Sequence, residues 1–173
     1  MNIKFKNIVT VAAGMIAAAV LTGCKVTYSL SGASIPATAK TVSIAYFPNN
    51  ATLVSPTLSS TLTDALQSKF TNQTKLELVS ENGDLAFEGD ITDYTVTPTA
   101  VTSNDQAAMN RLTVKVRVKF TNRIDPSFDY NQTFSTFQEY PSSQDLSSVE
   151  STLIPELVDV LVDDIFNAAV SNW

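Results

Sequence analysis

The feature that most restricts the fold of this chain is an alternation of apolar and polar residues that runs from Arg111 to Arg123. The apolar residues are Leu112, Val114, Val116, Val118 and Phe120, and the odd positions hold Arg111, Thr113, Lys115, Arg117, Lys119, Thr121 and Arg123. Successive side chains of a β-strand point to opposite faces, so the pattern predicts a long strand with one buried face. The fold must therefore contain a sheet that is covered on one side.

The exposed face of this strand would carry five basic residues, Arg111, Lys115, Arg117, Lys119 and Arg123. Side chains two apart on a strand lie about 6.6–6.8 Å from each other, so the central three would form a row of cations. Such a row attracts phosphates or carboxylates. Two other interpretations stay open: acids on neighbouring strands, such as Glu88 and Asp90, balance the cations, or the basic residues protect an exposed edge strand.

The N-terminal part of the chain has the layout of a secretory leader. Lys4 and Lys6 precede an uncharged, mostly apolar run from Ile8 to Leu21, which is too short to span a bilayer. Leu21-Thr22-Gly23-Cys24 follows and resembles the bacterial lipoprotein box. That resemblance implies that Cys24 becomes an acylated mature N-terminus. Because Lys25 is not Asp and no acidic run follows, sorting rules for such lipoproteins imply the outer membrane and its periplasmic side.

These observations predict three parts: a signal peptide over residues 1–23, a lipidated cysteine with a tether over 24–40, and a single domain over 41–173. Of the 11 basic residues, Lys4 and Lys6 lie in the leader, so nine remain against 17 acidic ones, a net charge of −8. An acidic domain of this kind is not expected to bind nucleic acid.

Catalysis is not expected from this composition. The chain has no His and a single Cys, so the commonest general base, the commonest metal ligand and any disulfide are missing. No glycine-rich phosphate loop or metal-ligand cluster occurs in the sequence. We therefore predict no catalytic residues, no metal site, no cofactor and no enzymatic activity.

Shorter patterns predict the remaining elements. Val42, Ile44 and Tyr46 indicate one face of a strand over 41–47, and Ser55-Pro56 indicates the start of a helix that continues to Phe70. Further strands are expected over 76–79, 85–97 with a bulge at Gly89, and 128–140 with a bulge between its aromatic residues.

A helix over 146–173 is expected to close the chain. Ser147 and Glu150 have the spacing of a capping box, and Pro155 predicts a kink or a restart near Ile154. This order of elements predicts an α+β fold, in which two helices pack on one face of a four- to five-stranded, mainly antiparallel sheet as a two-layer sandwich.

Several segments resemble the LptE-like lipoproteins of the Bacteroidetes group. They are the lipoprotein box, Ser31–Pro36, Val42–Ala51, Asn110–Thr113, Leu146–Glu150 and Asp163–Asn167. The resemblance implies an outer-membrane lipoprotein that plugs the β-barrel of the lipopolysaccharide translocon, helps it assemble and contacts lipopolysaccharide. Lys115, Arg117 and Lys119 would then meet lipid phosphates, with Arg111 and Arg123 as further candidates.

In this reading the outer face of the sheet and its loops over residues 49–53 and 99–109 would fill the lumen of the barrel. The alternative is a structural adaptor, or pilot, lipoprotein of another envelope transport complex. The partner that co-purifies with the protein discriminates between the two.

Overall fold

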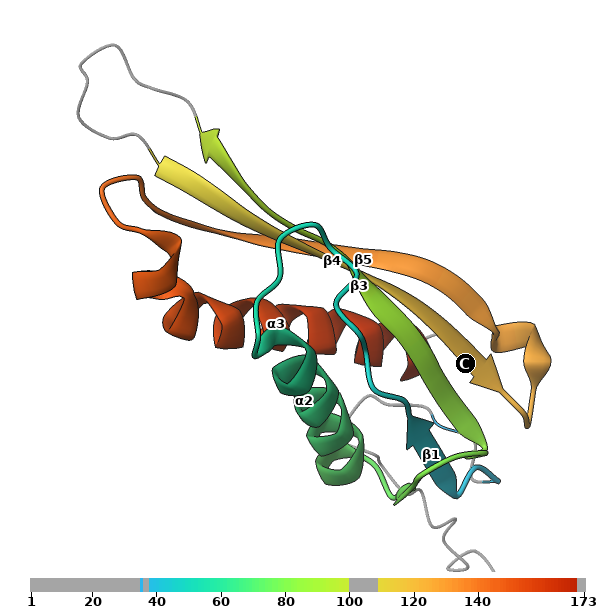
Figure 1. Cartoon of the computed structure of the whole chain (residues 1–173). Helices are drawn as coiled ribbons and strands as arrows, with labels where there is room; N and C mark the ends of the chain where they lie inside the picture. Colours follow the sequence, from blue (N-terminus) through green and yellow to red (C-terminus); the bar gives the residue numbers. More distant parts are fainter. Residues whose placement is uncertain (1–34, 36–37, 100–108, 171–173) are drawn as a thin grey trace, which may run out of the picture. The chain divides into compact units, whose positions relative to one another are not determined.

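The computed structural model describes residues 35, 38–99 and 109–170. Its elements are β1 (Thr41–Ile44), α2 (Leu58–Gln73), β2 (Glu77–Val79), β3 (Leu85–Thr99), β4 (Met109–Asn122), the short 3₁₀ turn η1 (Pro126–Phe128), β5 (Tyr130–Pro141) and α3 (Leu146–Val170). The five strands form one sheet in the order β2-β1-β3-β4-β5, and both helices lie on the same side of it (Figure 1). The predicted α+β sandwich is confirmed.

Most of the sheet is an antiparallel meander of β3, β4 and β5. All five apolar residues of the alternating stretch are at most 1% exposed and face the helices. The connection between β4 and β5 is closed by Asn122, whose side-chain Oδ1 accepts hydrogen bonds from the backbone N–H groups of Ile124 and Asp125. A short polar side chain that bonds the backbone two or three residues on is a typical turn former.

β1 lies in the interior of the sheet and is parallel to both of its neighbours, β2 and β3. The strand ends at Ile44, after which the chain bends so that Phe47 is fully buried and Tyr46 is 62% exposed. The prediction that Tyr46 shares the buried face of Val42 and Ile44 is therefore wrong. The chain beyond β1 still bonds to β3, because Ile91 N–H donates to the Pro48 carbonyl and Asn50 N–H donates to that of Ile91.

The segment before β1 is already part of the fold. Ile35 and Ala39 pack against the core. The carboxylate of Asp84 accepts hydrogen bonds from the backbone N–H groups of Lys40, at 2.8 Å, and Thr41, at 3.0 Å. These contacts join the start of β1 to the start of β3.

α2 buries a narrow stripe that includes Leu58, Leu62, Leu66 and Phe70, as the spacing predicts. Its N-cap is Thr57 and not Ser55, and no side chain caps the helix there. The polar residues of its first turns instead make hydrogen bonds within the helix and to the preceding connection. Thr63 Oγ1 accepts from Phe47 N–H at 3.2 Å and donates to the Ser59 carbonyl at 2.8 Å.

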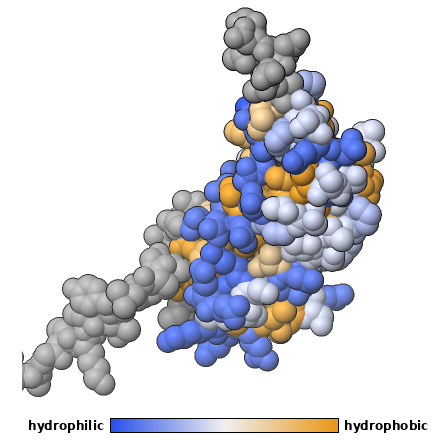
Figure 2. Space-filling model, turned by 90° about the vertical axis from the view of Figure 1, so that its left-hand side faces the viewer, coloured by the Kyte–Doolittle hydropathy of each residue, from blue (hydrophilic) through white to orange (hydrophobic). Residues whose placement is uncertain are grey.

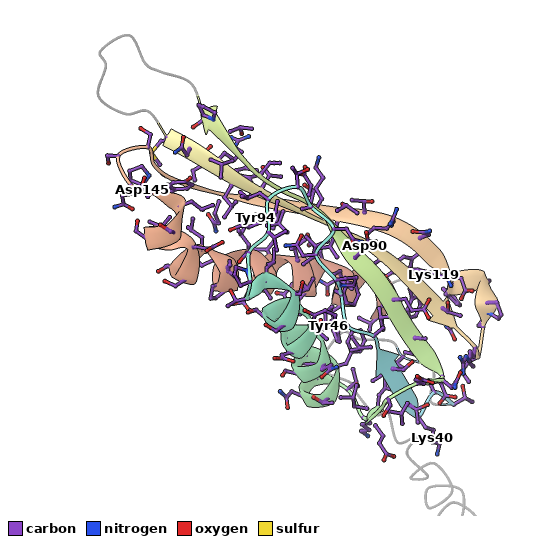
Figure 3. The ribbon with its side chains drawn as sticks, viewed as in Figure 1. Lys40, Tyr46, Asp90, Tyr94, Lys119 and Asp145 are labelled. Atoms are coloured by element: carbon purple, nitrogen blue, oxygen red, sulfur yellow. The ribbon has the colours of Figure 1, made fainter. Side chains whose placement is uncertain are left out.

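α3 is a single helix that continues through Pro155, so the chain does not restart there. Its start also differs from the expected capping box, because Ser147 lies inside the helix. Glu150 reaches the sheet and accepts a hydrogen bond from the Tyr94 hydroxyl. Burial, followed by the Glu150 carboxylate, raises the pKa of Tyr94 well above its usual value. The hydroxyl therefore stays protonated and donates; Figure 3 shows Tyr94 between the sheet and α3.

A row of aromatic rings crosses the core from one layer to the other. Phe70 of α2 lies 5.0 Å from Phe166 of α3 and 4.7 Å from Phe87 of β3, measured between ring centroids. The row continues through Phe120 of β4 to Tyr130, the first residue of β5. Ring pairs at such distances add to the free energy of burial, so this row ties every large element of the fold together.

β5 pairs with β4 from Tyr130 to Pro141 without a register shift. The predicted bulge in this strand is therefore wrong. The aromatic spacing that suggested it has another cause, because Phe134 is buried whereas Phe137 lies on the opposite face and is 50% exposed.

Candidate functional site

The face of the sheet turned away from the helices carries the predicted basic residues. The odd-numbered residues of β4 lie on this outer face, and Lys115, Arg117 and Lys119 are exposed. The strand therefore presents its polar side chains as the alternation predicts. Figure 2 shows one side of the molecule, where apolar residues form separate patches between hydrophilic ones.

Each of the three central cations faces an acid on β3. Lys119 Nζ lies 3.2 Å from Glu88, Arg117 Nη2 lies 2.8 Å from Asp90, and Lys115 Nζ lies 3.1 Å from Asp93. The strand register places these residues opposite one another (Figure 3 labels Asp90 and Lys119). The row of cations is thus one half of an ion-pair ladder, and its repulsion is largely balanced.

The two outer members of the row have different partners. Arg111 donates to the Glu139 carboxylate of β5 at 2.7 Å, and its guanidinium lies 4.1 Å from the centre of the Phe137 ring. Arg123 donates to the amide oxygen of Asn82 at 2.9 Å. Among the residues that the structure describes, Arg123 is the member of the row without a carboxylate in ion-pair contact.

The pair between Arg117 and Asp90 is the best fixed of the ladder. Arg117 Nε and Nη2 donate to the two carboxylate oxygens at 2.9 and 3.0 Å, and Asn50 donates to the same carboxylate at 3.1 Å. The Asp90 side chain is only 12% exposed. Two parallel bonds to a largely buried carboxylate hold a guanidinium in one orientation. Asp90 and Asn50 therefore fix Arg117.

The pair between Lys119 and Glu88 is the loosest. Their side chains are 60% and 63% exposed and share one hydrogen bond. Ion pairs in water contribute about 0–1 kcal/mol to stability, so Lys119 can exchange its partner at little cost.

A cavity of about 260 Å³ lies beside Arg123 on the outer face. The polar residues of its lining include Ser43, Ser80, Glu81 and Glu88. Arg123 is the cation of this cavity. The cavity thus continues the ion-pair ladder toward β1.

Asp93 is a partner that the sequence pattern did not assign. The register of β3 against β4 shifts between Ile91 and Asp93, so even residues face outward before the shift and odd residues after it. The bulge was expected at Gly89 but lies at Thr92. Because of this position, Asp93 faces Lys115. Counting from the turn between β4 and β5 would have found Glu139 opposite Arg111, because that hairpin is regular.

Other predicted features fall outside the described residues, namely Cys24, residues 1–23 and most of the 99–109 loop. Within residues 35, 38–99 and 109–170, no helix is long and apolar enough to cross a membrane. The same residues contain no group of three or more side chains that could hold a metal ion.

Comparison with known proteins gives one family and several related folds. A family model described as "LptE: Lipopolysaccharide-assembly" matches residues 39–169. No curated protein sequence gives a significant match. Lipoprotein B from Nitrosomonas europaea is 15% identical with a TM-score of 0.51, and the match covers 83% of this chain and 88% of that one. A protein from Xanthomonas campestris is 14% identical with a TM-score of 0.54, over 80% and 89% of the two chains. At these identities the solved structures share the fold only.

Proposed function

Because the chain belongs to the lipopolysaccharide-assembly family LptE, we propose that it is a lipoprotein held in the outer membrane by an acylated Cys24. In this proposal it plugs the β-barrel of the lipopolysaccharide translocon, helps that barrel assemble and contacts lipopolysaccharide during its insertion. Its role is binding, without a chemical step, and its membrane attachment comes from the acyl chains, of which one alone would anchor only marginally.

The observation that carries the ligand contact is the position of the cations on a sheet face that neither α2 nor α3 covers. Both helices lie on the other side, and the basic residues stay exposed although they are paired. A phosphate offers three acceptor oxygens to the three central cations, which are each paired with a carboxylate in this structure. Because exposed ion pairs are weak, the exchange of Glu88 for a phosphate at Lys119 costs little free energy.

The members of the row have different parts in this proposal. Lys119 and Lys115 would meet the phosphates directly, and Arg123, which is bonded to the neutral Asn82 amide, is a further candidate. Arg117 is held by Asp90 and would position the row. Arg111 is engaged by Glu139 and Phe137, so it is the weakest candidate for a direct contact.

Contact with a barrel wall is supported by exposed apolar residues in the connection between β1 and α2. Tyr46, Leu53 and Val54 are 62%, 46% and 57% exposed. They flank or lie within residues 49–53, one of the two regions expected to meet the barrel. Exposed apolar side chains grouped in one connection are typical of protein contact sites.

Charge reversal tests the ligand contact. We expect Lys119→Glu to lower the affinity for lipopolysaccharide at least about fivefold, because one attraction is replaced by a repulsion. Lys75→Glu changes the net charge equally at an exposed site after α2 and is the matched control. Binding is measured by titration of the acylated protein, with circular dichroism as a check of folding. Equal affinities for the two variants would remove the proposed contact.

Affinity capture tests the plug. The acylated protein is purified from outer membranes in mild detergent and its partners are identified by mass spectrometry. A stoichiometric translocon barrel is the expected result. A different envelope complex would favour the adaptor alternative instead.

A further inference from the structure

β5 is the last strand of the sheet and its outer edge has no partner among the described residues. The sheet order ends at β5, and its backbone pairs only with β4. α3 packs beneath the strand, where the Tyr130 hydroxyl donates to the Ile165 carbonyl at 3.5 Å. Within the described part of the chain, no other strand pairs with this edge, and at its end the Pro141 carbonyl accepts from Gln144 N–H.

The backbone groups on this edge can be identified from β4. The carbonyl of Lys115 accepts from Thr92 Oγ1, and that of Arg117 faces Gly89, so both point toward β3. In an antiparallel sheet the N–H and C=O of one residue point to the same side, and adjacent residues alternate. Even residues of β4 therefore bond to even residues of β5. The free N–H and C=O groups belong to Asn131, Thr133, Ser135, Phe137 and Glu139.

This edge lacks the features that normally prevent strand pairing. Between Tyr130 and Gln138 it has no Pro, no charge and no bulge, and its side chains are Thr, Ser, Asn, Gln and aromatics. Proteins usually protect a long edge strand with Lys, Pro or a bulge. A regular, uncharged edge of this length is a surface for another strand.

We propose that β5 pairs antiparallel with β5 of a second copy of this chain, about a two-fold axis at Ser135. Ser135 then faces its own symmetry mate, Thr133 faces Phe137, and Asn131 faces Glu139. The two sheets become one continuous sheet through both copies. An antiparallel edge is compatible with such an axis, because the same surface serves both copies.

The side chains favour this occupant and this register. Glu139 is the only charged residue of the edge, and it would face Asn131, behind which lies Lys119 of the second copy. Arg111 remains on the other side of the same Glu139. The two Glu139 carboxylates are kept apart at opposite ends of the interface. Phe137, now 50% exposed, would pack on Thr133, and aromatic pairs with β-branched residues stabilise sheets.

The inference goes beyond the proposed function and does not rest on it. It uses only the free edge of β5 and the side chains beside it. A failed lipopolysaccharide or barrel experiment would leave it standing.

Association is measured on the full acylated protein in density-matched mild detergent, by sedimentation equilibrium over a dilution series. Ser135→Pro removes the N–H that faces the second copy but none that bonds to β4, and Pro is tolerated at such edge positions. We expect it to weaken dimerisation about tenfold or more, since both copies lose a hydrogen bond. Ser135→Thr keeps the N–H and should dimerise like the wild type.

A charge variant tests the same interface without changing the backbone, in case Ser135→Pro perturbs the strand. Ser135→Lys places two like charges opposite each other and should also weaken the dimer, whereas Ser68→Lys, exposed on α2, should not. A monomeric wild type, or a dimer that neither Ser135→Pro nor Ser135→Lys weakens, would overturn the proposal.

Oxidative crosslinking tests the register. Mixed Thr133→Cys and Phe137→Cys proteins should form a disulfide between unlike copies, and each alone should not, with the wild type as the control for Cys24. Crosslinking of these cysteines to another envelope protein and not to each other would assign the edge to a different partner.

Discussion

Asp84 connects the chain that enters β1 to the turn that leads into β3. Besides the two backbone bonds to its carboxylate, its own N–H donates to Thr41 Oγ1 and its carbonyl accepts from Arg123 N–H, both at 2.9 Å. The bonds from Lys40 and Thr41 lower the pKa of Asp84, with Arg123 adding to the effect. The ionised carboxylate therefore stabilises the folded state.

The stability that Asp84 contributes depends on pH. Because the folded pKa is depressed, this stabilisation is present above the pKa of the unfolded chain, about 3.9, and is lost as the pH falls through the lower folded value. We expect Asp84→Ala to cost about 1 kcal/mol at neutral pH. The Asp84→Asn protein should lose less stability than the wild type as the pH falls below about 4. Urea unfolding at a series of pH values measures both, and Asp64→Asn, exposed on α2, should retain the wild-type profile.

The two glycines near Asp84 illustrate what residue types can and cannot reveal. In the turn before β3 the residue with a positive φ is Asn82, at 59°, and not the neighbouring Gly83. A Cβ at Gly83 would instead lie 2.5 Å from Ser43 N. At Gly89 it would collide with the Arg117 carbonyl and with the Phe47 ring. Both glycines are needed for close approach, which depends on partners far away in the sequence.

Pro155 is exposed in the middle of α3, where it cannot donate a hydrogen bond to the preceding turn. Pro155→Ala should restore that bond and stabilise the protein by about 1–3 kcal/mol, since the side chain takes no part in the core. Thermal and urea unfolding measure the change. Glu156→Ala, exposed one residue on, should alter stability by less than about 0.5 kcal/mol. A destabilised Pro155→Ala protein would contradict this expectation.

The elements that the sequence predicted well are those with local signals. β4 follows from its alternation, and the cores of the two helices follow from the spacing of their apolar residues. The interior position of β1 could not be predicted, because parallel strands are joined by long connections and leave no turn signature. For the candidate site, the cations were found from the pattern. The identity of Asp93 as a partner required the bulge at Thr92, which no residue type marks.

At the scale of the whole molecule, Phe70 is the ring where the two layers meet. It is fully buried and contacts rings from α3 and β3. We expect Phe70→Ala to cost about 3–5 kcal/mol, the usual range for an aromatic side chain removed from a core. Tyr46→Ala, at a ring that is 62% exposed, should cost less than about 1 kcal/mol. Denaturant unfolding compares the two, and a similar loss in both would contradict the role of the aromatic row.

The interior position of β1 also has a mechanical consequence. Any tension on the chain that precedes Thr41 enters the domain at a strand with hydrogen-bonded neighbours on both sides. A pull along that strand loads both ladders together in shear, so they cannot peel open one bond at a time. A load that enters through this strand therefore has to break both ladders before the domain opens.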